Sequence, residues 1–318
     1  MMHRRAILFM LFLMMFSILL TLIFGLMLEM GTLDREVIMS PWFIIISQML
    51  AFLLPLTIWL GIHKEKLNVF LPHMRLGSIN ITCIIGLSLL LQPAMMVVSG
   101  LTTIFFPNEV SEMVMGMVGY PLLLLIIAIA VTPAICEEVV FRGYMQKKYE
   151  NKSFWSMAIS TGFFFGVIHF NPQQFFYAFV MGIIFAYMVH VTMSIRAAVI
   201  AHFVMNASQI TFLWVMVRLP ELLEEHPDFD MHAQPSDAEI VMAFVLLGVI
   251  AIFSTIAAGI LFNFFAKHNK KRLEDYRAKH PMPETSSEPQ PESCLKDRVI
   301  DGALIAAVAS LYLIFVFG

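Results

Sequence analysis

Two adjacent carboxylates stand out in this sequence because they lie inside a long apolar stretch. Glu137 and Glu138 occur in TPAICEEVVFRGY, whereas the other acidic residues lie in loops or near the ends of apolar runs. Ionisable groups within such segments are costly and therefore indicate function. Arg142 lies four residues after Glu138, so on one helix these two side chains meet and offset each other's charge. Glu137 is rotated by about 100° around the helix and has no such partner, which leaves its carboxylate available for chemistry.

Two histidines and an asparagine complete the polar set. His202 and Asn206 are four residues apart in a later apolar run, so both project from one face of a helix. Phe165 and His169 have the same spacing in an earlier run. A carboxylate, two imidazoles and a carboxamide that converge from three helices form a set typical of a site that activates water and hydrolyses an amide bond.

Each of these groups has a chemical task in such a site. Glu137 could act as the general base that takes a proton from water, and His169 could hold that water or share its proton. His202 and Asn206 could donate hydrogen bonds to the oxyanion formed on a peptide carbonyl, where a low dielectric strengthens their effect.

The elements that must position these groups are membrane-spanning helices. The chain has 318 residues, of which 59% are hydrophobic and 14% charged, and its mean hydropathy is +0.81. Soluble domains are only about 45–50% apolar and about 25% charged. A span needs roughly 20 apolar residues, so the sequence predicts an all-α, polytopic transmembrane helical bundle of about eight or nine spans. The apolar runs lie at 6–28, 41–62, 79–106, 120–141, 154–170, 174–192, 195–217, 239–266 and 302–318.

The charge balance excludes other classes of protein. The net charge is -3, which does not suit a nucleic-acid binder, and the three cysteines contain no C-x-x-C pair that would indicate a disulfide framework or a thiolate metal site. Lys and Arg favour the cytoplasmic side of short loops. With the N-terminus in the cytoplasm, all 20 of them except Arg35 and Arg218 fall on that side. We expect a multi-pass membrane protein with a cytoplasmic N-terminus.

Three motifs carry a resemblance to a known family. EEVVFR (137–142) looks like E-E-x-x-x-R, FGVIH (165–169) like F-x-x-x-H, and HFVMN (202–206) like H-x-x-x-N. In this order, on successive apolar segments, they resemble the CAAX protease and bacteriocin-processing (CPBP, also ABI) family, which includes the type II CAAX prenyl endopeptidases. The resemblance implies a helical intramembrane endopeptidase with a cavity open to the cytoplasm and a membrane-associated peptide or protein substrate.

The resemblance also implies a role for each motif residue. Glu137 would be the catalytic glutamate and His169 its assistant, while His202 and Asn206 would form the oxyanion site. The residues that would support them are Glu138, Arg142 and Phe165.

The apolar runs, the composition and the resemblance together divide the chain into five parts. These are two N-terminal spans (1–78), a protease core (79–217), an outer acidic loop with the following span (218–266), a disordered cytoplasmic linker rich in Lys, Pro, Glu and Ser (267–301), and a last span (302–318).

Two questions stay open on the sequence. Glu137, His169 and His202 could supply the three protein ligands of an open zinc site, although the chain has no H-E-x-x-H, so the cofactor is either none or Zn²⁺. A non-proteolytic membrane scaffold or immunity protein on the same fold, or a proton-coupled transporter, would use the same groups differently.

One distance conflicts with straight spans of equal tilt. At about 1.5 Å per residue, His169 would lie about 24 Å from Ser153 at the cytoplasmic end of its run, far deeper than the other motif residues. We therefore expect the segment 154–170 to start deeper in the bilayer, to tilt or to be short.

Overall fold

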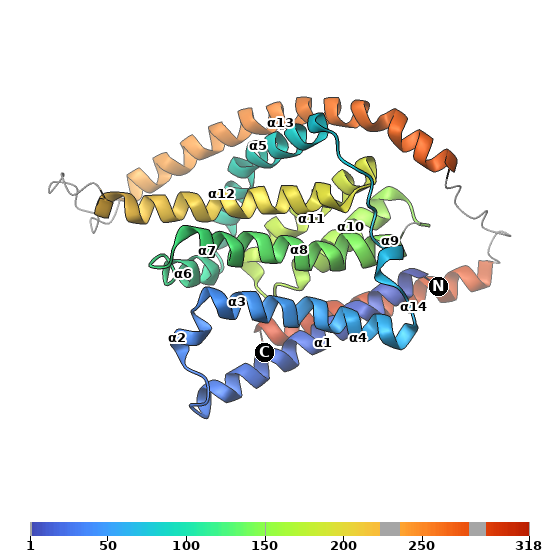
Figure 1. Cartoon of the computed structure of the whole chain (residues 1–318), viewed down its shortest axis with the longest axis horizontal. Helices are drawn as coiled ribbons and strands as arrows, with labels where there is room; N and C mark the ends of the chain where they lie inside the picture. The colour runs from blue at the N-terminus through green and yellow to red at the C-terminus, as the bar shows by residue number, and fades with distance from the viewer. Residues whose placement is uncertain (1, 150, 223–235, 280–290, 318) are drawn as a thin grey trace.

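The computed structural model describes residues 2–149, 151–222, 236–279 and 291–317, and nearly all of them are helical (Figure 1). The α-helices are α1 (Met2–Glu29), α2 (Arg35–Ile38), α3 (Pro41–Gln48), α4 (Leu54–His63), α5 (Ser78–Thr103), α6 (Glu109–Met115), α7 (Leu122–Ile126), α8 (Thr132–Glu138), α9 (Gln146–Lys148), α10 (Phe154–Val167), α11 (Pro172–Thr192), α12 (Ile195–Leu222), α13 (Asp237–Lys279) and α14 (Pro291–Phe317). A 3₁₀-helix, η2 (Leu67–Val69), and three π-helices, η1 (Met49–Leu53), η3 (Ile127–Val131) and η4 (Val139–Met145), complete the set. The predicted all-α class is confirmed.

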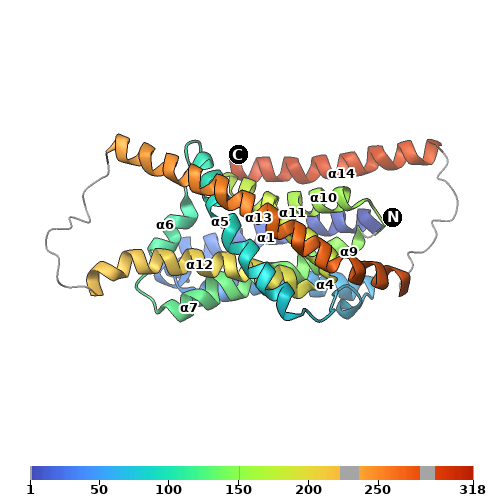
Figure 2. The same ribbon diagram turned by 90° about the horizontal axis from the view of Figure 1, so that it is seen from above.

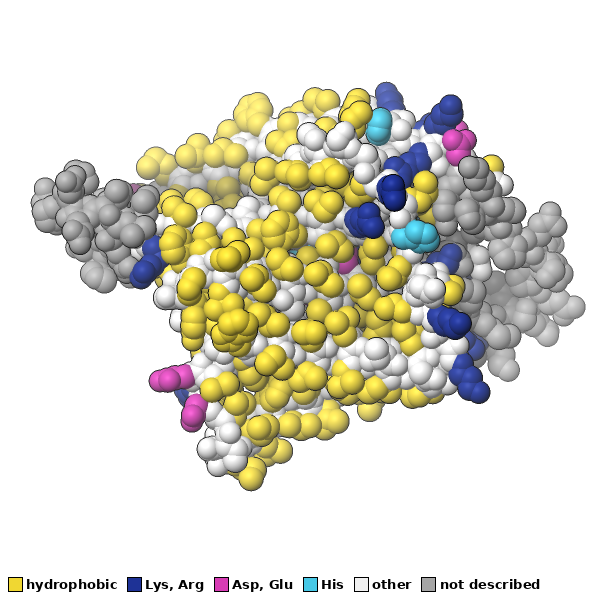
Figure 3. All heavy atoms as spheres, in the orientation of Figure 1, with side chains coloured by type: hydrophobic (Ala, Val, Ile, Leu, Met, Phe, Trp, Pro, Cys, Tyr) yellow, Lys and Arg dark blue, Asp and Glu magenta, His cyan; other side chains and the backbone are white. Residues whose placement is uncertain are grey.

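Seven of the described helices are long and apolar enough to cross a membrane. They are Arg4–Glu29, Pro41–His63, Ser78–Thr103, Leu122–Lys148, Pro172–Thr192, Ile195–Arg218 and Ala238–Asp275, and two shorter apolar helices, Phe154–Val167 and Gly302–Val316, fall in the remaining predicted runs. The protein is thus an integral, multi-pass membrane protein, as predicted. Figure 3 shows hydrophobic side chains over most of the visible face and Lys and Arg gathered at one end, the asymmetry used to predict the orientation.

The span Leu122–Lys148 lies at the centre of the bundle. It contains α7, η3, α8, η4 and α9, and α12 packs along it, while α3 and η1 pack against α8 and η3. The α10–α11 hairpin contacts its η4 end. In Figure 1, α13 arches over α5 on one side of this centre, and α1 and α14 lie on the other; Figure 2 places α14 and α12 along opposite sides of the molecule.

A proline sets the local geometry of the central span. Pro133 has no N–H group to donate to the carbonyl of Ile129, four residues earlier. The helix widens into the π-helix η3 at this point, and the side-chain amide of Asn206 on α12 donates to the Ile129 carbonyl instead, at 3.0 Å. π-Helices of one turn are rare and often occur at functional sites.

Glycines allow α10 and α11 to pack closely. A Cβ on Gly182 would lie 2.6 Å from the Gly162 Cα, and a Cβ on Gly162 would lie 3.0 Å from the Phe179 carbonyl oxygen. Gly162 and Gly166 are spaced as small-x-x-x-small, a pattern of close helix contact in membranes. The backbones can therefore approach to a distance that larger residues would prevent.

A charged contact joins the N-terminal helices to the central span. Glu65, just after α4, accepts from Lys148 Nζ at 2.6 Å and from Arg5 Nη1 at 3.0 Å, and Trp59 Nε1 donates to the Tyr144 hydroxyl oxygen at 2.6 Å. These contacts lie at the end of the span that we predicted to be cytoplasmic.

The predicted disordered linker at 267–301 was too long. α13 continues to Lys279 and α14 begins at Pro291, so both ends of that segment are helical. Residues 280–290, and residues 223–235 of the predicted acidic loop, lie outside the described residues. Lys and Glu are good helix formers, and Lys270 and Glu274 form an i,i+4 ion pair at 4.0 Å. The helix is also held to α5, because Asn80 and Asn269 exchange two buried hydrogen bonds of 3.1 and 2.8 Å.

Candidate active site

Glu138 lies at the centre of a buried charge network. Its Oε2 forms an ion pair with Arg142 Nε at 3.2 Å, and its Oε1 lies 2.9 Å from His202 Nδ1. The side chains of Glu138 and Arg142 are both fully buried. The pairing of these two residues, predicted from their spacing, is confirmed, and His202 is a second partner that the spacing did not predict.

Arg142 is held from three directions. Besides Glu138, its Nη2 donates to the carbonyl oxygen of Gly182 on α11 at 3.1 Å, and its guanidinium carbon lies 4.5 Å from the Phe165 ring centroid and 5.4 Å from that of Phe185. Faces of aromatic rings attract cations, and more strongly where water is excluded. The packing of Gly182 against α10 thus also fixes a carbonyl group that Arg142 needs.

Phe165 contacts both histidines of the predicted site. Its ring lies edge-on to His169, with centroids 5.4 Å apart, and to His202, at 5.8 Å. On its other face His202 stacks on Phe185, at 5.4 Å and 26°. The structure therefore gathers both imidazoles and the Arg142 guanidinium around one aromatic ring, which explains the spacing of the F-x-x-x-H segment.

His169 lies beyond the end of its helix. α10 ends at Val167, and a turn with a left-handed residue, Phe170 (φ 49°), leads into α11. With 14 residues, α10 is shorter than the predicted run. α10 begins where the predicted run begins and ends three residues before the end of that run, and the turn that follows places His169 edge-on to Phe165.

Glu137 is buried, with 2% of its surface exposed. Among the described residues its Oε2 has no hydrogen-bond partner. The side chains that interact with it electrostatically are those of His202, Glu138, Arg142 and Gln48. Glu138 thus has two basic side chains as direct ion-pair partners, whereas Glu137 Oε2 has no hydrogen-bond partner among the described residues.

Asn206 occupies a place that sequence reasoning did not predict. Its amide nitrogen donates to the Ile129 carbonyl exposed by Pro133. A carboxamide nitrogen carries two protons, so one N–H remains for another acceptor. Asn206 therefore links α12 to the central span whatever part it takes in chemistry.

The predicted zinc ligands do not fit a metal centre. Within the described parts of the chain, no group of three or more His, Cys, Asp or Glu side chains is placed to hold a metal ion. Glu137, His169 and His202 therefore do not form a common coordination site among the described residues.

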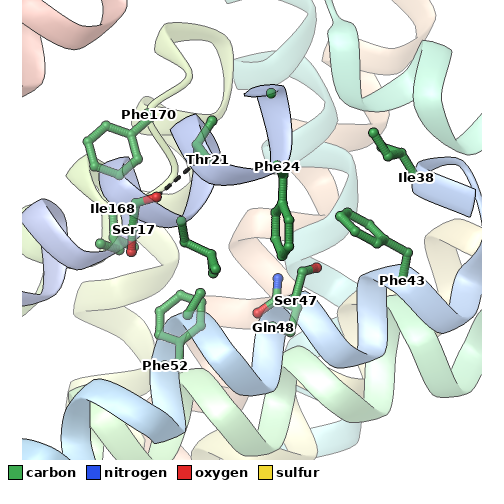
Figure 4. A pocket seen from close by; sticks show the side chains of 13 residues that line it. Ser17, Thr21, Phe24, Ile38, Phe43, Ser47, Gln48, Phe52, Ile168 and Phe170 are labelled. Atoms are coloured by element: carbon green, nitrogen blue, oxygen red, sulfur yellow. Dashed lines mark hydrogen bonds between the residues drawn. The ribbon is translucent and has the colours of Figure 1, made fainter. Parts of the chain in front are cut away.

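A cavity of about 460 Å³ borders the site on the side of the N-terminal helices. Its walls come from α1, from α3 and η1, and from Ile168 and Phe170 on either side of His169 (Figure 4). Gln48 lines this cavity and also acts on Glu137. Gln48 was not predicted from the sequence because ionisable residues were considered first. A carboxamide in the middle of the apolar run 41–62 could have indicated this residue, since polar side chains in spans form hydrogen bonds between helices.

Comparison with known proteins agrees with the motifs. Residues 119–208 match the family model described as type II CAAX prenyl endopeptidase Rce1-like. The matched segment lies within the predicted core 79–217 and contains all three motifs, whereas Gln48 and most of the cavity lie outside it. Searches of curated proteins and of solved structures gave no match. Over residues 119–208, this membrane protein is thus similar to the type II CAAX prenyl endopeptidases.

Proposed function

We propose that this protein is an intramembrane endopeptidase that hydrolyses a peptide bond with water activated by Glu137. The buried carboxyl group of Glu137, with an oxygen that has no partner among the described residues, supports this proposal most directly. The family match supports a peptidase, and the neighbouring network of Glu138, Arg142 and His202 supplies fixed charges around the site.

In the proposed mechanism Glu137 accepts a proton from water as the water oxygen attacks the peptide carbonyl. The new C–O bond places negative charge on the carbonyl oxygen. Collapse of this intermediate breaks the C–N bond, and the proton taken by Glu137 passes to the leaving nitrogen. His169 orients this water for the attack.

His202 and Asn206 stabilise the oxyanion in this proposal. Because Glu138 binds His202 Nδ1, the Nε2 atom is left to face the substrate. The second N–H of Asn206 donates to the same oxygen.

We also propose that no metal is needed, that the N-terminus lies in the cytoplasm and that the protein resides in a bacterial inner membrane. The first follows from the poor fit of the three predicted ligands. The second follows from the distribution of Lys and Arg, and labelling of single cysteines placed in the loops from either side of the membrane tests it.

Cleavage assays on the purified protein in lipid nanodiscs test the proposed reaction. The substrates are a farnesylated peptide ending in a CAAX sequence, the same peptide without the prenyl group, and a mixed library of apolar peptides. Loss of a general base lowers the rate by about 10²–10⁴-fold, so we expect that loss for Glu137→Gln with an unchanged melting temperature. Glu274→Gln, at an exposed glutamate of α13, is the matched control.

Two outcomes contradict the proposal. Undiminished cleavage by Glu137→Gln refutes the assignment of the base. Absence of cleavage of every peptide by the folded wild-type protein favours a non-proteolytic scaffold.

A further inference from the structure

The cavity beside the site has the size of a ligand pocket. Its volume of about 460 Å³ falls in the range of about 300–1,000 Å³ typical of small-molecule sites. Aromatic side chains form much of its wall: Phe24 from α1, Phe43 and Phe52 from α3 and η1, and Phe170 from the turn after His169 (Figure 4). Such a wall suits a large apolar group.

Two of the polar side chains along this wall use their hydroxyl protons within their own helices. Thr21 Oγ1 donates to the Ser17 carbonyl at 3.0 Å, and Ser47 Oγ donates to the Ile44 carbonyl at 3.1 Å. A hydroxyl bonded in this way is compatible with an apolar neighbour.

Gln48 differs from these hydroxyls. Its Oε1 is buried and has no hydrogen-bond partner among the described residues, although buried carbonyl oxygens nearly always have one. Its side chain also interacts with Glu137. The cavity therefore has an aromatic wall and, at Gln48, an acceptor with no donor among the described residues.

We propose that this cavity binds a large apolar side chain of the substrate next to the scissile bond, and that Gln48 Oε1 accepts a hydrogen bond from a substrate peptide N–H. This inference rests on the proposed peptidase function. A peptide supplies both an apolar side chain and an N–H donor, whereas the hydrocarbon tail of a lipid supplies no donor for Gln48. The N-terminal helices, which lie outside the matched family segment, thus determine which peptides are cleaved.

Gly25 offers a way to fill the cavity without disturbing the protein. It lines the cavity, and a Cβ at this position meets no heavy atom within 4 Å. Gly61 in α4 has equally open surroundings but does not line the cavity. Gly25→Leu and Gly61→Leu are therefore a matched pair, and Gln48→Met removes the acceptor while it keeps a side chain of similar length.

The assay uses peptides in which the residues on either side of the cleaved bond vary through Ala, Leu, Phe and Trp. A pocket discriminates apolar groups by about 10- to 200-fold, so we expect wild type to prefer Phe or Trp at one of these positions by at least tenfold. Gly25→Leu abolishes this preference through a higher KM for the Phe and Trp peptides. Gln48→Met raises KM for all peptides about tenfold, and Gly61→Leu changes nothing.

The outcomes separate this inference from the proposed function. If wild type cleaves and Glu137→Gln does not, the peptidase function holds; an unchanged side-chain preference in Gly25→Leu then refutes the cavity as the substrate subsite. If Gly25→Leu alters only the binding of a spin-labelled phosphatidylcholine, the occupant is a lipid tail and the inference is wrong. If the wild-type protein cleaves none of the peptides, both proposals fail.

Discussion

Removing Arg142 tests whether the charge network holds the bundle together. In Arg142→Met, Glu138 loses its ion pair, the Gly182 carbonyl loses its donor and the rings of Phe165 and Phe185 lose a cation. Because the side chains of Glu138 and Arg142 are fully buried, water cannot replace these contacts. Breaking a buried ion pair by removing one partner costs about 3–5 kcal/mol, and we expect a loss of that order in the free energy of unfolding.

The second half of this test replaces both partners. In Glu138→Leu with Arg142→Met, no unpaired charge remains, and replacement of a whole buried pair by apolar residues is often neutral or stabilising. We expect the double variant to recover at least half of the stability lost by Arg142→Met, while cleavage stays absent because His202 loses its Glu138 partner. Reversible unfolding in mixed detergent micelles, followed by Trp fluorescence, measures both. A loss below about 1 kcal/mol in the single variant, or no recovery in the double variant, refutes the reasoning.

Three further predictions concern pH, packing and metal. Burial raises the pKa of Glu65, but the hydrogen bonds and charges of Lys148 and Arg5 outweigh it and hold the pKa below its ordinary value. The stabilisation by Glu65 is therefore complete above the pKa of this group in the unfolded chain and is lost as the pH falls through the lower pKa of the folded protein. Melting curves of Glu65→Gln between pH 7 and 3 should lack this pH-dependent loss. Gly182→Ala places a Cβ against Gly162 and costs about 1–3 kcal/mol, whereas Gly248→Ala, in open surroundings, leaves the melting temperature unchanged. Treatment with 1,10-phenanthroline followed by dialysis leaves cleavage unchanged.

Clear results would contradict each of these. A Glu65→Gln variant with the wild-type pH profile would show that Lys148 and Arg5 do not stabilise the fold through this carboxylate. Equal stability of the Gly182 and Gly248 variants would show that α10 and α11 can move apart. Stoichiometric zinc in an active preparation, with activity lost on chelation and restored by zinc, would overturn hydrolysis without a metal.

The spans and the central ion pair could be predicted from the sequence because both depend on local patterns. Apolar runs of sufficient length give helices in a bilayer, and four-residue spacing on one helix brought Glu138 to Arg142. The short α10 departed from its run because a left-handed residue at Phe170 starts a turn within an apolar segment, and hydropathy does not distinguish a turn from a helix there.

The contacts between distant segments could not be predicted in this way. Each of these contacts depends on how whole helices pack, so no pattern of nearby residues predicts it. Examples are the contacts of His202 with Glu138, of Asn206 with the Ile129 carbonyl group and of Gln48 with Glu137. Pro133 gave part of the signal, since it exposes a carbonyl that needs a donor, but the sequence does not tell which helix supplies that donor. The catalytic roles of the motif residues remain predictions for the assays above.

The bonds from α12 to the central span have a mechanical consequence. His202 and Asn206 lie one turn apart on α12 and attach to Glu138 and Ile129, on either side of Pro133. Because the two helices are joined at two points, neither can slide along the other or rotate against it without breaking a bond. A shift by one residue, about 1.5 Å, would break both bonds. The register of Glu137 against α12 therefore depends on a proline, because the carbonyl group that Pro133 leaves without a backbone donor is the one that Asn206 binds.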